Sequence, residues 1–155
     1  MQCQRCLTTP NYHSFQLVAD LSGIHYFYCF PAHNKQSVRT HEDMINFVSH
    51  FPEDKQWSLL FHANGYGLTA MMPLFLAIEM GKIVQEKHSK TLQKVFVIEG
   101  SWFFQFLLKC IFPFFSAQMR DKFVLVNGSL LEVITELRKV GFTIQQLEPL
   151  RSRFG

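Results

Sequence analysis

The feature that most constrains this chain is a helix-forming segment, residues 102–112, that is apolar on almost every side. Only Gln105 and Lys109 interrupt its aromatic and aliphatic residues, and because they stand four positions apart they lie on one stripe of the helix. A helix with one side in water carries a much wider polar face. The rest of this surface must therefore contact protein or lipid.

The apolar helix belongs to a longer unit, residues 93–126. Residues 95–98 before it are all apolar, which is typical of an interior strand in a parallel sheet with helices on both faces. Pro113 ends the helix because proline lacks an N–H and crowds the preceding turn. A second strand, residues 122–126, follows, so a strand, an apolar helix, a proline and a strand form one unit.

Strands and helices alternate along the rest of the chain. Repeated strand–helix–strand connections favour an α/β fold with right-handed crossovers. We predict one domain over residues 1–155 with a mostly parallel sheet covered by helices on both faces, and residues 1–23 receive no assigned element. The remaining predicted elements are strands at 26–30 and 57–61, a helix that Thr40 caps and that carries Met44, Phe47, Val48 and Phe51, a helix at about 69–87, and a helix between Ser129 and Gly141.

Composition indicates a folded protein outside the membrane. Hydrophobic residues make up 48% of the chain and charged residues 17%, and 17 of the 155 residues are Phe, which by itself fits a Phe-rich core. The longest apolar run, residues 102–115, is too short and too polar to span a bilayer. No secretory signal is recognisable, so we expect a cytoplasmic protein that can bind membranes peripherally. A net charge of +3 is too small to imply nucleic acid as a partner.

The cysteines fit a reducing compartment. Cys29 and Cys110 fall within a predicted strand and helix, where buried thiols are common. Cys3 and Cys6 have a spacing that can supply half of a tetrahedral zinc site, and His13 lies near them in the sequence. Because no second ligand pair follows at a suitable spacing, we predict no metal there and interpret both residues as thiols of an unstructured N-terminal segment.

Motifs for catalysis are weak. Residues 65–70 fit a loose dinucleotide fingerprint, but no acid follows at the required distance, which favours a plain turn. The histidines are scattered and no serine stands in a Gly-x-Ser-x-Gly elbow. His62 and Glu99 are expected to end two parallel strands at the same edge, where ligands bind in open α/β sheets. We predict a structural or ligand-orienting role for this pair, and neither catalytic residues nor enzymatic activity.

The order of residues in the 93–126 unit carries a resemblance to a known family. The matching positions are Val97, Ile98, Trp102, Phe104, Lys109, 113–115 and 120–125. In order and spacing they resemble the lipid-gate region of the CRAL-TRIO family, named after cellular retinaldehyde-binding protein and Trio, which includes phosphatidylinositol and tocopherol transfer proteins. The resemblance extends over about residues 57–141. Glu99-Gly100-Ser101 stands where the family usually has Asn-Ala-Pro, which indicates a divergent branch.

The resemblance implies a lipid-binding or lipid-transport module in which an apolar gate helix covers the ligand. It implies no cofactor besides a bound lipid, and it names as partners a phospholipid or other hydrophobic ligand and the membrane surface. Phosphoinositide-binding relatives imply an anionic headgroup, for which Lys109, Arg120 and Lys122 are the candidate contacts. The residues expected at the lipid are Phe96, Ile98, Trp102, Phe103, Phe104, Leu107, Leu108, Ile111, Phe114 and Phe115.

Which side of the apolar helix meets the sheet stays open in the sequence. If the side with Phe103, Leu107, Cys110 and Phe114 covers the sheet, the opposite side with Phe104, Leu108 and Ile111 faces outward, and an acyl chain could cover it. Alternatively the segment with Phe15, Leu17, Val18 and Leu21 covers that side and leaves no cavity. A further alternative is a protein-interaction or homodimerisation module with the same fold, as in regulators of Rho-type GTPases.

Overall fold

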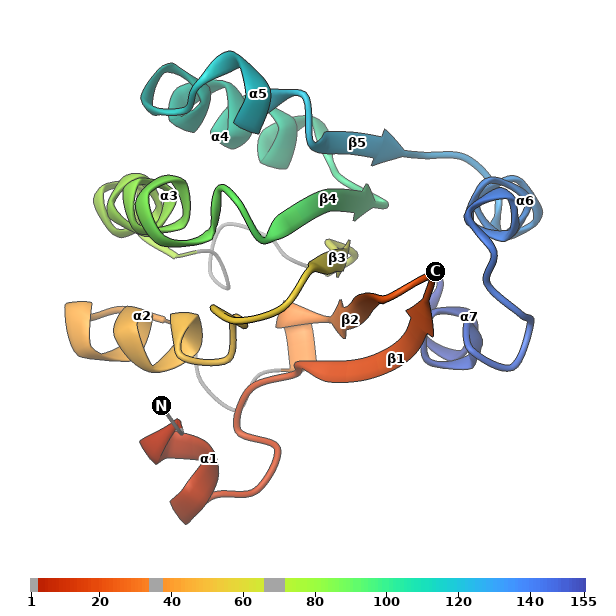
Figure 1. Cartoon of the computed structure of the whole chain (residues 1–155), viewed down its shortest axis with the longest axis horizontal. Coiled ribbons are helices and arrows are strands. Elements are labelled where there is room, and N and C mark those ends of the chain that lie inside the picture. Colours follow the sequence, from red (N-terminus) through yellow and green to blue (C-terminus); the bar gives the residue numbers. More distant parts are fainter. Residues whose placement is uncertain (1–2, 34–37, 66–71) are drawn as a thin grey trace.

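The protein forms a three-layer α/β structure, described by a computed structural model for residues 3–33, 38–65 and 72–155 (Figure 1). The strands are β1 (Gln16–Leu21), β2 (Ile24–Cys29), β3 (Trp57–His62), β4 (Leu92–Ile98) and β5 (Phe123–Val126). The helices are α1 (Gln4–Thr8), η1 (Pro31–His33), α2 (His41–Val48), α3 (Leu74–His88), α4 (Trp102–Ile111), η2 (Phe112–Phe114), α5 (Ala117–Arg120), α6 (Leu130–Val140) and α7 (Glu148–Arg153).

The five strands form one sheet in the order β1-β2-β3-β4-β5. Strands β2 to β5 pair in parallel, and β1 pairs with β2 in an antiparallel hairpin. Helices α2, α3 and α4 cover one face, and α6 and α7 cover the other (Figure 1). The predicted mostly parallel sheet with helices on both faces is therefore confirmed.

Strand β1, which the sequence did not predict, forms a hairpin with the predicted strand β2. The turn of this hairpin consists of Ser22 and Gly23, with φ angles of 55° and 81°. Two successive residues with positive φ match the tight turns that join antiparallel strands. The N-terminal segment thus contains an edge strand, and Phe15, just before it, stacks on Phe27 with ring centroids 4.8 Å apart.

Capping residues in the sequence correctly predicted where α2 begins and where α6 begins and ends. Thr40 Oγ1 accepts a hydrogen bond from Asp43 N–H at 3.1 Å at the start of α2. Ser129 Oγ accepts one from Glu132 N–H at 3.2 Å at the start of α6, and Gly141, with φ of 122°, ends that helix. Two boundaries were wrong: α2 ends at Val48, before Phe51, and α3 begins at Leu74. Residues 66–71, which include most of the glycine-rich turn, lie outside the described residues.

Two apolar clusters sandwich the sheet. The first, beneath α2, α3 and α4, includes the fully buried Cys29, whereas Cys110 is half-buried. The second lies beneath α6 and α7 and includes Leu147 and Leu150. Among the described residues, no helix is both long and apolar enough to cross a bilayer.

Candidate functional site

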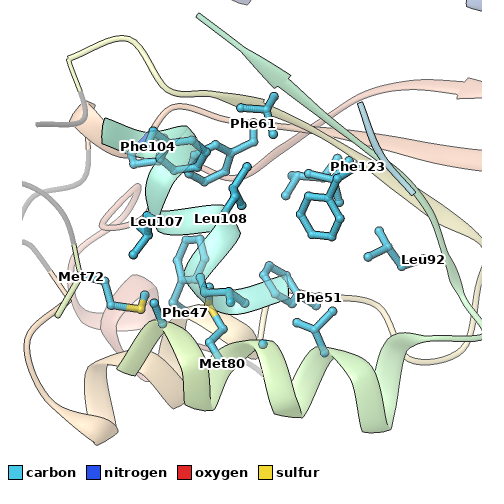
Figure 2. A pocket seen from close by; sticks show the side chains of 18 of the residues that line it. Phe47, Phe51, Phe61, Met72, Met80, Leu92, Phe104, Leu107, Leu108 and Phe123 are labelled. Atoms are coloured by element: carbon cyan, nitrogen blue, oxygen red, sulfur yellow. The ribbon is translucent and has the colours of Figure 1, made fainter. Parts of the chain in front are cut away.

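An apolar cavity of about 160 Å³ lies between the sheet and helices α2, α3 and α4. Figure 2 shows side chains from the sheet and from two of these helices pointing into the cavity. They are Phe61 and Phe123 from strands, Met80 from α3, and Leu107 and Leu108 from α4. Every side chain that lines the cavity is hydrophobic. The space therefore suits a hydrocarbon group, because the described side chains around it offer a polar atom few partners.

Helix α4 forms one wall of the cavity and is anchored by polar contacts at its two ends. Ser101 Oγ accepts a hydrogen bond from Phe104 N–H at 3.2 Å, and Gln105 Nε2 donates to the Gly100 carbonyl at 3.2 Å. After η2, Ser116 N–H donates to Gln85 Oε1 on α3 at 2.9 Å. Between these ends α4 is held to the core mainly by apolar side chains.

The side of α4 that meets the sheet is the reverse of the one considered from the sequence. Phe104, Leu108 and Ile111 are buried against the core, whereas Trp102 is 79% exposed and Phe106 57% exposed. Phe104 stacks on Phe61 of β3 with ring centroids 5.2 Å apart. Because both sides of this helix are apolar, its periodicity could not show which one faces inward.

The N-terminal segment does not cover the side of α4 with Phe104, Leu108 and Ile111, so that alternative is wrong. Val18 and Leu21 pack against the second apolar cluster, beneath α6 and α7. Leu17 is exposed, and Phe15 lies against Phe27 and Phe51.

The residues predicted at the lipid separate into four groups. Those that line the cavity are Phe104, Leu107, Leu108, Ile111 and Phe115. Phe96 and Ile98 belong to the second apolar cluster, on the opposite face of the sheet. Trp102 and Phe114 are exposed, and Phe103 packs against the first cluster without lining the cavity.

Most of the cavity wall comes from residues that were not predicted at the lipid. The unpredicted lining residues are Pro31, Val38, Phe47, Phe51, Trp57, Leu59, Phe61, Met72, Ala77, Met80, Gly81, Val84, Leu92, Val95, Val97 and Phe123. For β4 the alternation of side chains along a strand could have separated the lining residues from the others. Val95 and Val97 point to the cavity, and Phe96 and Ile98 point away. No local sequence pattern indicated that side chains of α2 and α3 line the cavity, because this depends on how the helices pack.

The three candidate headgroup residues differ in their availability. Lys109 and Arg120 are exposed. Lys122 instead donates from Nζ to the carbonyl oxygens of Ser89 and Leu92, the latter at 2.7 Å. Burial lowers the pKa of this lysine. Lys122 is thus engaged in joining the end of α3 to β4, and its charge is not freely presented to solvent.

His62 and Glu99 meet at the carboxyl edge of the sheet, as the sequence predicted. His62 Nε2 lies 2.6 Å from Glu99 Oε2, and His62 Nδ1 lies 2.6 Å from the Tyr28 hydroxyl. Burial lowers the pKa of His62 and raises that of Tyr28, so both stay neutral at pH 7. A neutral imidazole can donate through Nε2–H to Glu99 and accept at Nδ1 from Tyr28.

This network is closed by the C-terminal residues. The Phe154 ring stacks over His62, and the Arg153 guanidinium lies 5.8 Å from the centre of the Tyr28 ring. Both nitrogens of His62 are occupied and its side chain is fully buried. The arrangement is that of a structural network and offers no free base to a substrate.

Sequence comparison agrees with this architecture. The profile of the CRAL/TRIO domain matches residues 30–139, which is more than half of the chain. These residues contain β3, β4, β5 and all three helices that cover the cavity. No curated protein shows significant sequence similarity to the chain. The protein is a member of the CRAL/TRIO domain family, and membership supports a lipid-binding module of the lipid-transfer type.

Proposed function

We propose that the protein binds one acyl chain of a phospholipid, or a comparable hydrophobic ligand, beneath α4, and that the outer side of α4 contacts the membrane during exchange. The observation that carries the proposal is the position of α4. It separates an apolar cavity of about 160 Å³ from an outer surface on which Trp102 and Phe106 are exposed.

The size of the cavity defines what has to move. A cavity of roughly 150 Å³ lined by Leu, Ile and Phe binds benzene. The cavity here has about 160 Å³, so it holds a group of that size and no whole acyl chain. Entry of a longer chain requires displacement of α4, whose contacts with the core are mainly apolar. An acyl chain would replace those contacts with equivalent ones.

Burial of the apolar chain favours binding of such a ligand. Burying one methylene contributes about 0.8 kcal/mol, so roughly ten methylenes contribute about 8 kcal/mol before the costs of ordering. The exposed aromatics support contact with the membrane, because Trp and Phe side chains partition into the interface.

Lipid exchange followed by mass spectrometry tests this function. The purified chain is incubated with vesicles of mixed phospholipids, re-isolated by gel filtration and extracted with organic solvent. We expect one phospholipid or fatty acyl ligand per chain, resistant to gel filtration. Recovery of protein without lipid, from vesicles and from expressing cells alike, would contradict the proposal.

A protein-interaction module is the second candidate function. The exposed Trp102 and Phe106 favour it, because aromatic residues are enriched at the centres of protein interfaces. A homodimer formed through α4 would bury both side chains. Light scattering during gel filtration separates the two functions: a lipid-free dimer supports the interaction module, whereas a lipid-loaded monomer supports the lipid carrier.

A further inference from the structure

Two cysteines and two histidines converge beside α1, on the far side of α2 from the cavity. Cys3 and Cys6 flank the first turn of α1, His13 precedes β1, and His50 follows α2. One ligand atom from each residue lies within 4.8 Å of every other. The expectation that no second ligand pair accompanies Cys3 and Cys6 is therefore wrong. It failed because His50 stands 44 residues after Cys6 and only the packing of α1 on α2 brings them together.

Four of the six distances between the ligand atoms are close to the edges of one tetrahedron. Zinc bonds of about 2.3 Å to sulfur and about 2.0 Å to nitrogen give tetrahedral edges of about 3.6 Å for S···N and about 3.3 Å for N···N. Here Cys3 Sγ lies 3.5 Å from His13 Nδ1, and Cys6 Sγ lies 3.5 Å from His50 Nε2. Cys6 Sγ lies 3.8 Å from His13 Nδ1, and the two nitrogens are 3.1 Å apart.

Hydrogen bonds alone do not account for this arrangement. His13 Nδ1 faces three atoms at once: Cys3 Sγ, Cys6 Sγ and His50 Nε2. A ring nitrogen has either one N–H or one lone pair, so it can form one good bond of this kind. A cation at the centre would satisfy all four atoms, each through its own lone pair.

We propose that Cys3, Cys6, His13 and His50 bind one Zn²⁺ in a closed, tetrahedral, structural site. Two thiolates and two imidazoles form a donor set that selects zinc by softness and geometry. The two thiolates also balance the charge of the ion, which suits a place where Cys3 and His13 are buried and Cys6 and His50 half-buried. With four protein ligands, the site has no open position for a substrate.

The role of the ion would be to fasten α1 to the body of the protein. Helix α1 has five residues, none of them buried, and isolated helices of that length are unstable in water. Its other polar contacts with α2 include Arg5 with Asp43 at 3.2 Å and Gln4 N–H with Asn46 Oδ1 at 3.1 Å. Both are on the surface or half-buried, so they stabilise the contact only weakly.

The same site lies next to the cavity wall. His50 stands between Phe47 and Phe51, and both of these side chains line the cavity. The His13 ring packs edge-on against Phe47 with ring centroids 5.4 Å apart. Zinc would therefore fix the end of α2 that forms this part of the wall. The metal site rests on its own four residues and stands whether or not the cavity binds lipid.

Metal analysis of the whole chain tests the proposal. The protein is purified without chelators, dialysed against metal-free buffer and analysed by plasma mass spectrometry, and we expect one zinc per chain. Replacing zinc with Co²⁺ should give the intense visible bands of a tetrahedral ion and a near-ultraviolet thiolate-to-cobalt charge-transfer band. Adding zinc to chelator-treated protein should raise the midpoint of thermal unfolding, because the ion binds the folded state.

Matched variants locate the site. Cys3→Ser and His50→Asn should lose the zinc and the charge-transfer band, whereas Cys110→Ser and His41→Asn, outside the cluster, should keep both. If a variant fails to fold, the cobalt spectrum and the zinc titration of the wild-type protein decide the question. The proposal is overturned if wild type binds no stoichiometric zinc after titration, if cobalt shows no thiolate band, or if Cys3→Ser retains the metal.

Discussion

Gly81 of α3 lies directly beneath Ile111 of α4: a Cβ atom at position 81 would stand 3.0 Å from Ile111 Cγ2 and 3.2 Å from Phe115 Cε1. The absence of a side chain at Gly81 therefore allows the C-terminal end of α4 to approach α3 closely. The other end of α4 carries the exposed Trp102. At that N-terminal end the contact with the sheet is the stacking of Phe104 on Phe61.

Replacing Gly81 with Val should disturb this helix contact. We expect the free energy of unfolding to fall by about 1–3 kcal/mol, because an added side chain in a packed contact forces its neighbours to shift. Urea denaturation measures the effect. Glu86→Val, at an exposed position of α3, measures the effect of a valine that makes no such contact. Valine is a better helix former than the glycine that it replaces at position 81, so a loss of stability there comes from the contact. Equal stability of the Gly81→Val and Glu86→Val variants would show that α3 and α4 are not in close contact.

Replacing Trp102 and Phe106 with Ser should weaken binding to phospholipid vesicles. Burying an aromatic side chain of this size contributes about 1.5–3 kcal/mol, so each change should reduce the partition coefficient by about 10-fold or more. Both side chains are exposed, so far-ultraviolet circular dichroism should not change. Leu131→Ser is the matched control, because Leu131 is 74% exposed on α6 at the other face of the sheet. An equal effect of all three changes would argue against contact through α4.

Aspartate at Leu108 or Ile111 is a poor test of membrane contact. Both side chains are buried against the core. A carboxylate there would lack a partner and destabilise the fold, so a loss of vesicle binding could not be attributed to the membrane.

Filling the cavity should prevent ligand binding while leaving the fold intact. Ala77 of α3 is buried and lines the cavity, so Ala77→Leu places additional carbon atoms in the space. We expect loss of the co-isolated lipid with a thermal midpoint equal to or above that of wild type, because a filled cavity regains packing contacts. Ala117→Leu, at an exposed position of α5, should keep the ligand. Retention of lipid by the Ala77→Leu variant would place the ligand outside this cavity.

The charge of Lys109 and Arg120 should matter on anionic vesicles only. Each basic residue near the membrane surface contributes about 1 kcal/mol, so Lys109→Gln combined with Arg120→Gln should weaken sedimentation with anionic vesicles by about 30-fold at low salt. The difference should shrink as the salt concentration rises, since the Debye length is about 8 Å at physiological ionic strength. Lys139→Gln on α6 is the control. Unchanged binding would leave Lys109 and Arg120 as solvated surface charges.

Stability should fall on mild acidification, and His88 should account for part of the loss. The His88 ring is buried against Phe51 and Trp57, and burial lowers its pKa. Nδ1 can donate to the Pro52 carbonyl, 3.1 Å away, in the neutral form. Since the folded-state pKa is lower than that of the unfolded chain, the unfolded chain binds more protons as pH falls below about 6.5. The free energy of unfolding is thus highest above that pH and decreases below it.

Urea denaturation at pH 7.5 and pH 5 in the presence of a chelator measures this dependence. His88→Gln should lose less stability between the two pH values than wild type, whatever its absolute stability. His41→Gln, at an exposed position, is the matched histidine substitution. An identical pH dependence in the His88→Gln variant would show that His88 titrates normally in the folded state.

The sequence by itself determined the local elements and the family. Caps at Thr40 and Ser129 and the glycine at position 141 marked helix ends because the signals involve residues within a few positions of each other. The apolar run of β4 predicted an interior strand, and β4 does lie between β3 and β5. The resemblance in residues 93–126 led to the family that the profile match shows.

Only the tertiary structure decided which surfaces meet. An all-apolar helix has no polar face to orient it, so the inward side of α4, with Phe104, was set by its packing on Phe61 of β3. Phe96 and Ile98 point away from the cavity because alternate residues of a strand face opposite ways, and the sequence did not show which face α4 covers. Cys6 and His50, 44 residues apart, meet only because α1 packs on α2. Contacts between distant residues depend on the whole fold, and no local pattern in this chain encodes them.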